Sequence, residues 1–273
     1  MTTTLRPVEP LQQHDDGTRS RRYQVCVNSR PVGTVHLATH PFFPATARLL
    51  DLRIEEPDRG RGRGTVAALA AEEVVRGWRC GWIEAIVPAD AEAALRLVTA
   101  LGYVQRNRGL EKRLGDVPPE LPAGSRGREL TDAEYARWLA DGTESYTRTW
   151  TERGVPEERA RAKSRDDHAR LLPQGAATPN MRISVLEHEG VPVGTVWVAL
   201  DEDRAFVYDV VADERFRGRG HGRSLMLLAE RHAVAAGKNR IGLNVFAGNT
   251  PAERLYESLG YEPTVYALHK QLL

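Results

Sequence analysis

A glycine-rich run in the second half of the chain has the composition of an anion-binding turn. Residues 217–222 read Arg-Gly-Arg-Gly-His-Gly, between a β-branched and aromatic run at 205–212 and a helical pattern of apolar residues that begins at Ser224. Glycine lets backbone N–H groups converge without obstruction by Cβ atoms, and a helix start adds unpaired donors. The run therefore predicts a site for a pyrophosphate, with Arg217 and Arg219 as charge partners.

Three other interpretations of this run remain open. An Arg-Gly-rich disordered segment that binds RNA is disfavoured, because the run is short and stands between two regular elements. A nucleotide P-loop is disfavoured, because the Gly-Lys-Ser/Thr ending is missing. A purely structural turn would also explain the glycines.

A second segment, residues 241–261, combines a strand pattern with a short helix. Ile241–Phe246 alternates as a strand does, and Thr250 is expected to cap the start of a helix that Gly260 ends. Tyr256 lies at the edge of the apolar stripe of this helix. The segment therefore predicts strand, turn and helix in direct succession.

Together the two motifs resemble those of the GNAT superfamily of N-acetyltransferases. The glycine run is similar to the acyl-CoA loop of that family, and the run from Asn249 to Tyr261, which ends in Leu-Tyr-Glu-x-Leu-Gly-Tyr, is similar to its second hallmark. The resemblance implies that Asn249 hydrogen-bonds near the pantetheine on a splayed strand pair and that Tyr256 protonates the leaving thiolate. The acyl-CoA-binding residues that it implies are Val210, Val211, Ala212, Arg217, Gly218, Arg219, Gly220, His221, Gly222, Arg223, Ser224 and Asn249.

Amide formation from a thioester needs a neutral amine, a stabilised oxyanion and a proton for the departing sulfur. A tyrosine with a pKa of about 10 is protonated at pH 7 and can supply that proton. A backbone N–H on the splayed strand, such as that of Val211, is a candidate for the oxyanion. Asp209 is the first candidate for the catalytic base, Glu187 is a weaker one, and a chain of waters is a third.

The resemblance to this family implies that the acceptor amine binds in a cleft built from the first two helices of the domain and a late hairpin. Tyr146, Trp150 and Trp197 are the substrate-contacting candidates, with His168 and Tyr266 beside them. Aromatic rings can enclose an amine by cation–π contact. Core packing explains the same residues.

The chain repeats itself at a shift of 158 residues. From Asp51 to Leu114 the shift gives 22 identities in 64 positions, including both glycine runs and both Leu-Gly-Tyr strings. Two homologous domains explain this pattern. We expect a first domain at residues 1–114, a Pro- and Gly-rich linker at 115–127, and a catalytic domain at 128–273.

The first domain is interpreted as a shortened, degenerate copy. Arg59, Gly62 and Gly64 keep the phosphate loop and form a possible second CoA site, but Ala91 and Val98 replace Asn249 and Tyr256. Segments 131–140 and 156–172 predict two helices in the second domain, whereas residues 12–22 of the first indicate a polar loop. We therefore expect the first domain to be catalytically silent, and either to hold CoA or only to pack against the second.

Composition narrows the function classes. The 38 Lys and Arg against 37 Asp and Glu give a net charge of +1, which argues against nucleic acid or anionic membrane as the main partner. The two cysteines carry no zinc or redox spacing, so no metal is expected, and no apolar run is long enough for a membrane span. Of the 38 cations only four are lysines, which indicates a high-GC bacterial genome. We expect a cytoplasmic protein.

The sequence therefore predicts an α/β (α+β) fold of two GNAT-type domains, each a mixed, mostly antiparallel sheet flanked by helices. The expected activity is transfer of acetyl from acetyl-CoA to a primary amine of a small molecule or peptide, by a monomer or homodimer. The alternative is a non-catalytic acyl-CoA sensor. Minor alternatives are an aminoglycoside acetyltransferase, for which Asp201, Glu202 and Asp203 would supply an acidic cleft, and an enzyme similar to mycothiol synthases.

Overall fold

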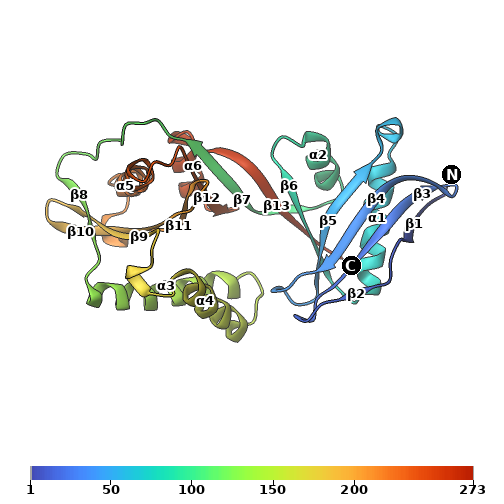
Figure 1. Cartoon of the computed structure of the whole chain (residues 1–273), viewed down its shortest axis with the longest axis horizontal. Coiled ribbons are helices and arrows are strands. Elements are labelled where there is room, and N and C mark those ends of the chain that lie inside the picture. Colours follow the sequence, from blue (N-terminus) through green and yellow to red (C-terminus); the bar gives the residue numbers. More distant parts are fainter. Residues whose placement is uncertain (1, 273) are drawn as a thin grey trace. The chain divides into compact units, whose positions relative to one another are not determined.

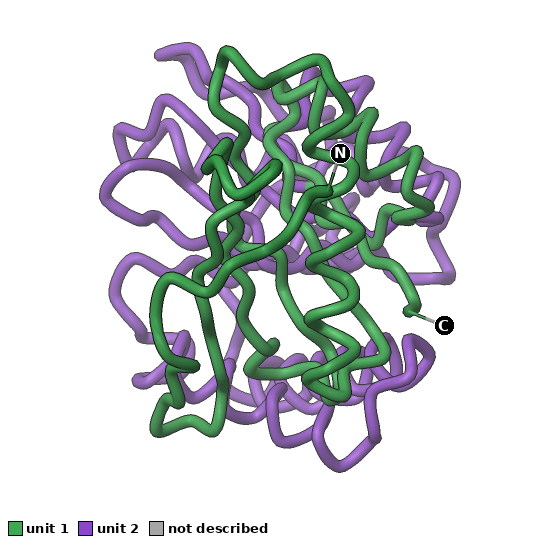
Figure 2. The backbone as a smooth tube through the Cα atoms, turned by 90° about the vertical axis from the view of Figure 1, so that its right-hand side faces the viewer, with its two compact units in different colours: residues 1–108, 264–273 green, residues 109–263 purple. Residues whose placement is uncertain are grey.

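The computed structural model describes residues 2–272, which form two compact units. Unit 1 comprises Met1–Arg108 and Thr264–Leu273, and unit 2 comprises Gly109–Pro263 (Figure 2). None of the helices in the described part of the chain is both long and apolar enough to cross a membrane.

The first elements in chain order are β1 (Thr3–Pro7), β2 (Gln12–Gln13), β3 (Arg19–Val27), β4 (Arg30–Thr39), β5 (Thr46–Ile54), η1 (Glu56–Asp58), α1 (Arg63–Gly77), β6 (Trp82–Pro88), α2 (Glu92–Ala100) and β7 (Val104–Arg113). They are followed by β8 (Ser125–Glu129), α3 (Asp132–Thr151), α4 (Glu157–Leu171), η2 (Gly175–Ala177), β9 (Met181–His188), β10 (Val191–Leu200), β11 (Ala205–Ala212), η3 (Glu214–Phe216), α5 (His221–Ala235), β12 (Arg240–Phe246), α6 (Thr250–Ser258) and β13 (Glu262–Gln271). Figure 1 labels the strands and the α-helices.

The sheet of unit 1 has the strand order β1-β3-β4-β5-β6-β13. Its neighbouring strands are antiparallel except β5 and β6, which are parallel. One face packs against α1, where Val25, Val35 and Ile83 are fully buried. Val35 alternates with the polar neighbours Thr34 and His36 along β4, as expected for a sheet with one covered face.

The sheet of unit 2 has the order β8-β9-β10-β11-β12, in which only β11 and β12 run parallel. One face packs on α5, with Val196, Leu225 and Ile241 in the core. The other face packs on α3 and α4 through a smaller cluster around Trp138 and Trp197. The mixed α/β architecture with helices on the sheets is the expected fold class.

Two elements, β3 and α3, have ends that differ from those predicted by the local sequence pattern. β3 begins at Arg19, so it includes part of the segment at 12–22 that reads as a polar loop. Its polar residues are accommodated because Ser20 pairs with Ala38 of β4 and because one sheet face of unit 1 carries polar side chains. α3 runs to Thr151, well beyond the expected end at residue 140.

The last strand of each half of the chain lies in the sheet of the other half. β13 pairs with β6 in unit 1, and the end of β7 belongs to unit 2, where Leu114 N–H donates to the Asn239 carbonyl. The compact units therefore differ from the expected domains 1–114 and 128–273 at residues 109–114 and 264–273. Residues 125–127 of the expected linker also belong to β8.

Each of these terminal strands has a lysine that forms an ion pair with a buried glutamate. In unit 2, Lys112 of β7 lies 2.8 Å from Glu230 of α5, which is 3% exposed. In unit 1, Lys270 of β13 lies 2.7 Å from Glu72 of α1, which is 1% exposed. The two pairs are related by the 158-residue shift, so the exchange preserves equivalent contacts in both units.

Candidate functional site

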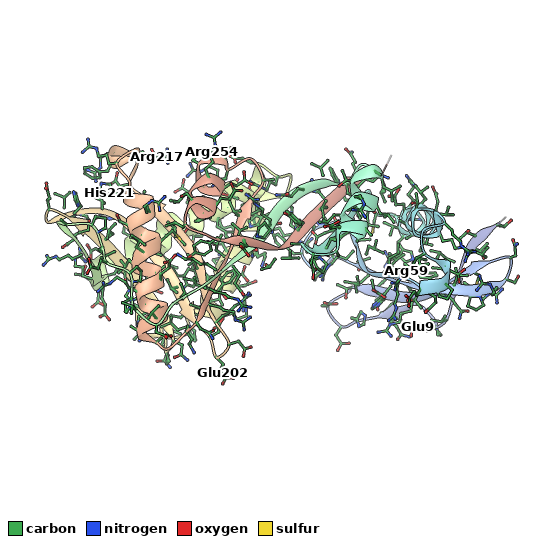
Figure 3. The ribbon with its side chains drawn as sticks, turned by 90° about the horizontal axis from the view of Figure 1, so that it is seen from above. Glu9, Arg59, Glu202, Arg217, His221 and Arg254 are labelled. Carbon is green, nitrogen blue, oxygen red and sulfur yellow. The ribbon has the colours of Figure 1, made fainter. Side chains whose placement is uncertain are left out.

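The glycine run forms the turn between β11 and α5. Figure 3 labels Arg217 and His221, the first and fifth residues of this run. Gly218 and Gly220 have φ of +79° and +83°, and Gly220 is the N-cap of α5. An added Cβ would meet no atom at either position, so backbone conformation alone requires glycine there. The first N–H groups of α5 consequently face the turn without side-chain cover, as an anion site needs.

The arginines of the turn are exposed and held by near neighbours. Arg217 lies 2.6 Å from Glu214, and the Arg219 guanidinium lies 5.6 Å from the centre of the Phe216 ring. Arg223 donates to the Ser258 hydroxyl at 2.6 Å, whereas the Ser224 side chain is buried beneath the turn. Arg217, Arg219 and Arg223 are thus the predicted loop cations with accessible side chains.

Gly222 places the phosphate turn close to α6. A Cβ at Gly222 would lie 3.2 Å from Cδ2 of Leu255, which is tighter than an ordinary contact. Close approach of the two helices brings Tyr256, the neighbour of Leu255, toward the end of β11. The third glycine therefore serves helix packing.

β11 and β12 diverge at the level of the predicted pantetheine site. Their parallel pairing runs from Ala205 with Ile241 to Val207 with Leu243. β11 nevertheless remains paired with β10 as far as Ala212. The backbone of Asp209, Val210, Val211 and Ala212 therefore has one edge directed away from β10 and open to an extended ligand.

Asp209 and Tyr256 lie within electrostatic range of one another at this opening. Burial raises the pKa of the Asp209 carboxyl to about 6, opposed by a hydrogen bond from the Val210 backbone. Burial also raises the pKa of Tyr256 to about 12, with a smaller contribution from the Asp209 charge. At pH 7.5 the site therefore holds one carboxylate and one protonated phenol, which can act as a base and an acid.

Asn249 occupies a different helical position from the one expected. It is the N-cap of α6, with its Oδ1 accepting from the Ala252 backbone N–H at 3.4 Å, whereas Thr250 is the first helical residue. Asn249 is exposed at the mouth of the splayed strands, and only one lone pair of its Oδ1 is used by the cap.

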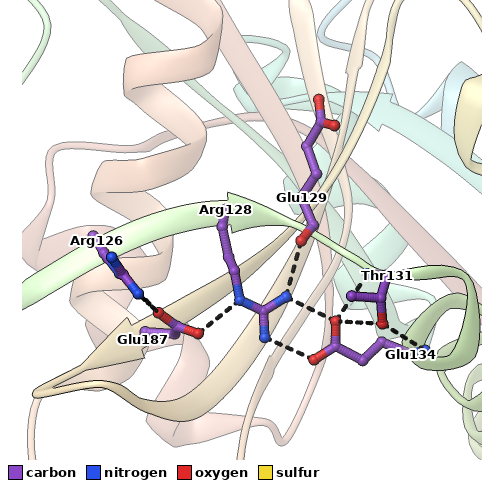
Figure 4. Close-up of polar contacts among 6 residues, drawn as sticks. All are labelled: Arg126, Arg128, Glu129, Thr131, Glu134 and Glu187. Atoms are coloured by element: carbon purple, nitrogen blue, oxygen red, sulfur yellow. Dashed lines mark hydrogen bonds and ion pairs between the residues drawn. The ribbon is translucent and has the colours of Figure 1, made fainter.

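Glu187 lies in an ion-pair network with Arg126 and Arg128, at 2.8 Å and 2.6 Å (Figure 4). Arg128 also binds Glu134, which forms the capping box of α3 with Thr131. Arg128 and Arg126 hold the pKa of Glu187 below its usual range. A carboxylate so engaged is a poor base, and the network instead ties β8 and β9 to the start of α3.

The three predicted substrate residues divide into two aromatic groups. Trp197 is the direct cross-strand partner of Asp209, is 5% exposed, and lies 4.8 Å from the Tyr208 ring. His168 stacks on Trp197 from α4 at 5.7 Å. Trp197 therefore forms the floor beside the candidate base.

Tyr146 and Trp150 form the second group with Phe246. The Tyr146 and Trp150 rings are 6.0 Å apart, and Trp150 meets Phe246 of β12 edge-on at 5.4 Å. The Tyr146 hydroxyl donates to Asp167 at 3.1 Å. Tyr266 belongs to unit 1, where it packs on that core.

Tyr208 is a site residue that sequence reasoning missed. The β10–β11 register shifts between Trp197 and Val198, which leaves Tyr208 as the extra residue of a β-bulge. The bulge turns Tyr208 to the side of Trp197, and its ring is 40% exposed. Strict alternation would have put Tyr208 and Asp209 on opposite faces, so the available pattern pointed away from it.

Unit 1 repeats the backbone of the loop. Gly60 and Gly62 have φ of +70° and +72°, Gly62 is the N-cap of α1, and a Cβ at Gly64 would lie 3.0 Å from Leu97. The β5–β6 ladder likewise ends at Leu49 with Ala85. Arg59 instead donates to the Ile54 carbonyl at 2.9 Å.

In unit 1 the positions equivalent to Asn249 and Tyr256 carry apolar side chains, whereas Asp51 stands where unit 2 has Asp209. Ala91 stands where Asn249 caps α6, and no side chain caps α2. Val98, at the position of Tyr256, is 4% exposed.

Known proteins resemble both regions of the chain. The model of the acetyltransferase (GNAT) family matches residues 2–103 and 137–261. The uncharacterized N-acetyltransferase YycN of Bacillus subtilis is 30% identical over 146 residues, which span 51% of this chain and 93% of YycN. The mycothiol acetyltransferase of Thermobispora bispora is 30% identical over 225 residues, 74% of this chain and 68% of that protein.

Two solved structures share the fold over nearly the whole chain. A GCN5-related N-acetyltransferase from Sphaerobacter thermophilus has a TM-score of 0.58 at 18% identity, covering 92% of this chain and 80% of that one. A tandem GNAT protein from the clavulanic acid biosynthesis pathway has a TM-score of 0.51 at 20% identity, covering 93% and 83%.

Proposed function

The chain belongs to the acetyltransferase (GNAT) family, with two GNAT regions, and we propose that its unit 2 transfers acetyl from acetyl-CoA to a primary amine by direct attack in a ternary complex. The family uses an acyl-CoA donor and acetylates amines. Assignment of the reaction to unit 2 rests on the residues described above.

The observation that carries this proposal is the pairing of Asp209 with Tyr256. Their pKa values lie near 6 and 12, so near neutral pH the first accepts a proton and the second retains one. Asp209 lies on β11 where that strand leaves β12, and Tyr256 lies on α6, whose Leu255 is approached closely by Gly222 of the glycine loop. This arrangement supports an acid and a base acting on opposite sides of one thioester carbonyl.

In the proposed reaction the amine nitrogen attacks the thioester carbonyl carbon, and its surplus proton passes to Asp209 directly or through water. The carbonyl oxygen becomes an oxyanion, for which the Val211 backbone N–H is the proposed donor. The carbon–sulfur bond then breaks with the electron pair on sulfur. Tyr256 supplies the proton, which yields the amide and CoA thiol.

We propose that unit 1 does not catalyse this reaction. Ala91 and Val98 can neither donate nor accept a proton. The loop at Arg59, Gly62 and Gly64 keeps the backbone of a phosphate site, and it is either a second CoA site or a structural turn. Calorimetry with acetyl-CoA gives the number of sites: two would assign one to unit 1, and one would reduce its loop to a structural turn.

The decisive experiment measures free-thiol release from acetyl-CoA across a panel of amines, with Tyr256→Phe and Asp209→Asn beside the wild type. The panel includes polyamines, amino acids, peptide N-termini, aminoglycosides and cysteinyl sugars. We expect turnover on one class and a loss of about 100-fold in kcat for Tyr256→Phe at unchanged acetyl-CoA affinity. Binding of acetyl-CoA with silence on every amine would favour the sensor instead.

A cysteinyl sugar is the second candidate acceptor. The observation that favours it is the likeness to mycothiol acetyltransferases, which spans 74% of this chain for the Thermobispora bispora protein. Turnover with cysteinyl sugars and with no other amine of the panel would identify a cysteinyl sugar as the acceptor.

A further inference from the structure

Two histidines lie together beside the phosphate loop of unit 2. His221 is the first residue of α5 and is 7% exposed (Figure 3). Its ring centre lies 5.3 Å from that of His188, the last residue of β9, and 6.3 Å from that of Phe216. His188 is held in turn by Ser125 of β8, with 2.9 Å between Nδ1 and Oγ. Neither imidazole forms an ion pair within residues 2–272.

The internal repeat supplies a comparison for this position. At the 158-residue shift, Arg63 and Asp58 of unit 1 stand where unit 2 has His221 and Phe216, and they form a buried ion pair. Asp58 also lies 2.7 Å from Arg30. Unit 1 therefore keeps a permanent, already neutralised cation beside its loop, whereas unit 2 keeps a titratable base with no carboxylate partner.

We propose that His221, positioned by His188, is the proton-accepting part of the phosphate site, so that binding of the CoA phosphates draws a proton from solvent onto the His221 imidazole. This inference rests on the proposed function, because its ligand is the acyl-CoA bound by unit 2. The acyl-CoA site would then gain a positive charge only when the phosphates of its ligand are bound.

The surroundings of His221 favour a neutral ring before the ligand binds. Burial, followed by the neighbouring His188 and Arg219, lowers its pKa. The facing groups are Phe216 and Arg219 from the loop and His188 from β9. His188 is itself surrounded by Gly124 and Ser125, where β8 begins, and by Glu189, which follows β9. A phosphate anion within about 4–6 Å favours the protonated ring by roughly 1–3 pKa units, enough to reverse its state near neutral pH.

Proton uptake is measurable without knowledge of the acceptor amine. Calorimetric titration of the full chain with CoA at pH 7.5, in buffers of different ionisation enthalpy, gives the protons taken up per ligand. A parallel titration uses 3′-dephospho-CoA, because a phosphate monoester titrates near pH 6 by itself whereas the pyrophosphate diester does not. We expect uptake of a fraction of a proton with both ligands, and an affinity that rises about threefold or more from pH 8 to pH 6.5.

Variants separate this linkage from other titrations. His221→Arg, which introduces the residue that unit 1 has, should bind 3′-dephospho-CoA with a pH-independent Kd and no proton uptake, and His188→Gln should reduce the uptake. Asp209→Asn should leave it in place, because that carboxyl is at the thioester end. His232→Gln is the matched control, since His232 lies on the same helix with its Nε2 bonded to Ser184 and its pKa lowered by burial.

Two outcomes would overturn the inference while leaving the proposed function intact. One is CoA binding by the wild type with no net proton uptake from either ligand. The other is uptake that persists in both His221→Arg and His188→Gln. If the wild type binds no CoA at all, the proposed function fails together with the inference.

Discussion

Burial of the Asp209 carboxyl raises its pKa and lowers the stability of the folded protein at neutral pH. Its folded pKa of about 6 lies above the value of about 3.9 in an unfolded chain, so the folded state binds this proton more tightly. The stabilisation from that proton is complete below pH 4 and is lost as the pH rises through 6. A buried carboxylate at pH 7.5 therefore costs stability where the proposed chemistry needs it.

Asp209→Asn should consequently raise the unfolding free energy at pH 7.5 by about 1–2 kcal/mol and leave it nearly unchanged at pH 4. Thermal melts at the two pH values measure this difference. The same substitution should abolish the rise in wild-type rate as pH increases through about 6. Equal melting temperatures at pH 7.5 would show that the carboxyl is not held out of water.

Tyr208 is predicted to line the acceptor side of the site. Because its ring lies on Trp197 and is 40% exposed beside Asp209, Tyr208→Ala should raise the KM for the amine about tenfold with the acetyl-CoA Kd unchanged. Tyr208→Phe keeps the ring and is the matched control, expected within about twofold of wild type. An unchanged amine KM in Tyr208→Ala would place the acceptor elsewhere.

Several residues show where sequence reasoning succeeds at this scale. The turn at residues 217–222 could be predicted because the glycines that form it are adjacent in the sequence. The positive φ of Gly218 and Gly220 depends on the turn alone and not on distant contacts. Tyr208 and the engagement of Glu187 could not be predicted, because a bulge and an ion-pair network depend on which strands become neighbours.

At the scale of elements, the terminal strands are held by their lysine–glutamate pairs. Glu230→Gln removes the negative charge that the largely buried Lys112 ammonium contacts. We therefore expect a loss of about 2–4 kcal/mol in the free energy of unfolding. Denaturant melts measure it. Glu92→Gln, which removes an exposed pair with Arg96 in α2, is the control and should cost under about 0.5 kcal/mol. A similar small cost for both would contradict the role assigned to the pair.

β10 supports β11 through the close approach of Gly194. A Cβ there would collide with the Val211 carbonyl and lie 2.8 Å from Leu225. Gly194→Ala should therefore displace β11, destabilise the protein by about 2 kcal/mol and weaken acetyl-CoA binding at least tenfold. Gly33→Ala makes the equivalent collision with Arg53 in unit 1 and should destabilise without changing affinity at the unit 2 site. Calorimetry on both variants checks the contrast.

The helices next to the loops were predicted, whereas strand ends were not. α5 and α6 follow from apolar periodicity, glycine stops and capping residues. The exchange of β7 and β13 could not be predicted, because both strands carry a lysine at the equivalent position and either pairing gives Lys112 and Lys270 a buried glutamate partner.

For the whole molecule, the exchanged strands predict one cooperative unfolding transition. Neither half of the sequence contains all the strands of its own unit, because β13 lies in unit 1 and the end of β7 in unit 2. Scanning calorimetry should give a single peak, and truncation after Pro263 should destabilise unit 1 as well as shorten the chain. Two independent peaks in the wild type would contradict this coupling.

The connection at residues 115–124 lies between β7 and β8, outside the paired strands of either sheet. It contains no strand or helix, and Val117 is 83% exposed. A protease cut there would leave two fragments, each holding a strand that the other fragment's sheet requires. The nicked protein should therefore elute as one particle, and the two halves, produced as separate polypeptides, should reconstitute the enzyme only when mixed.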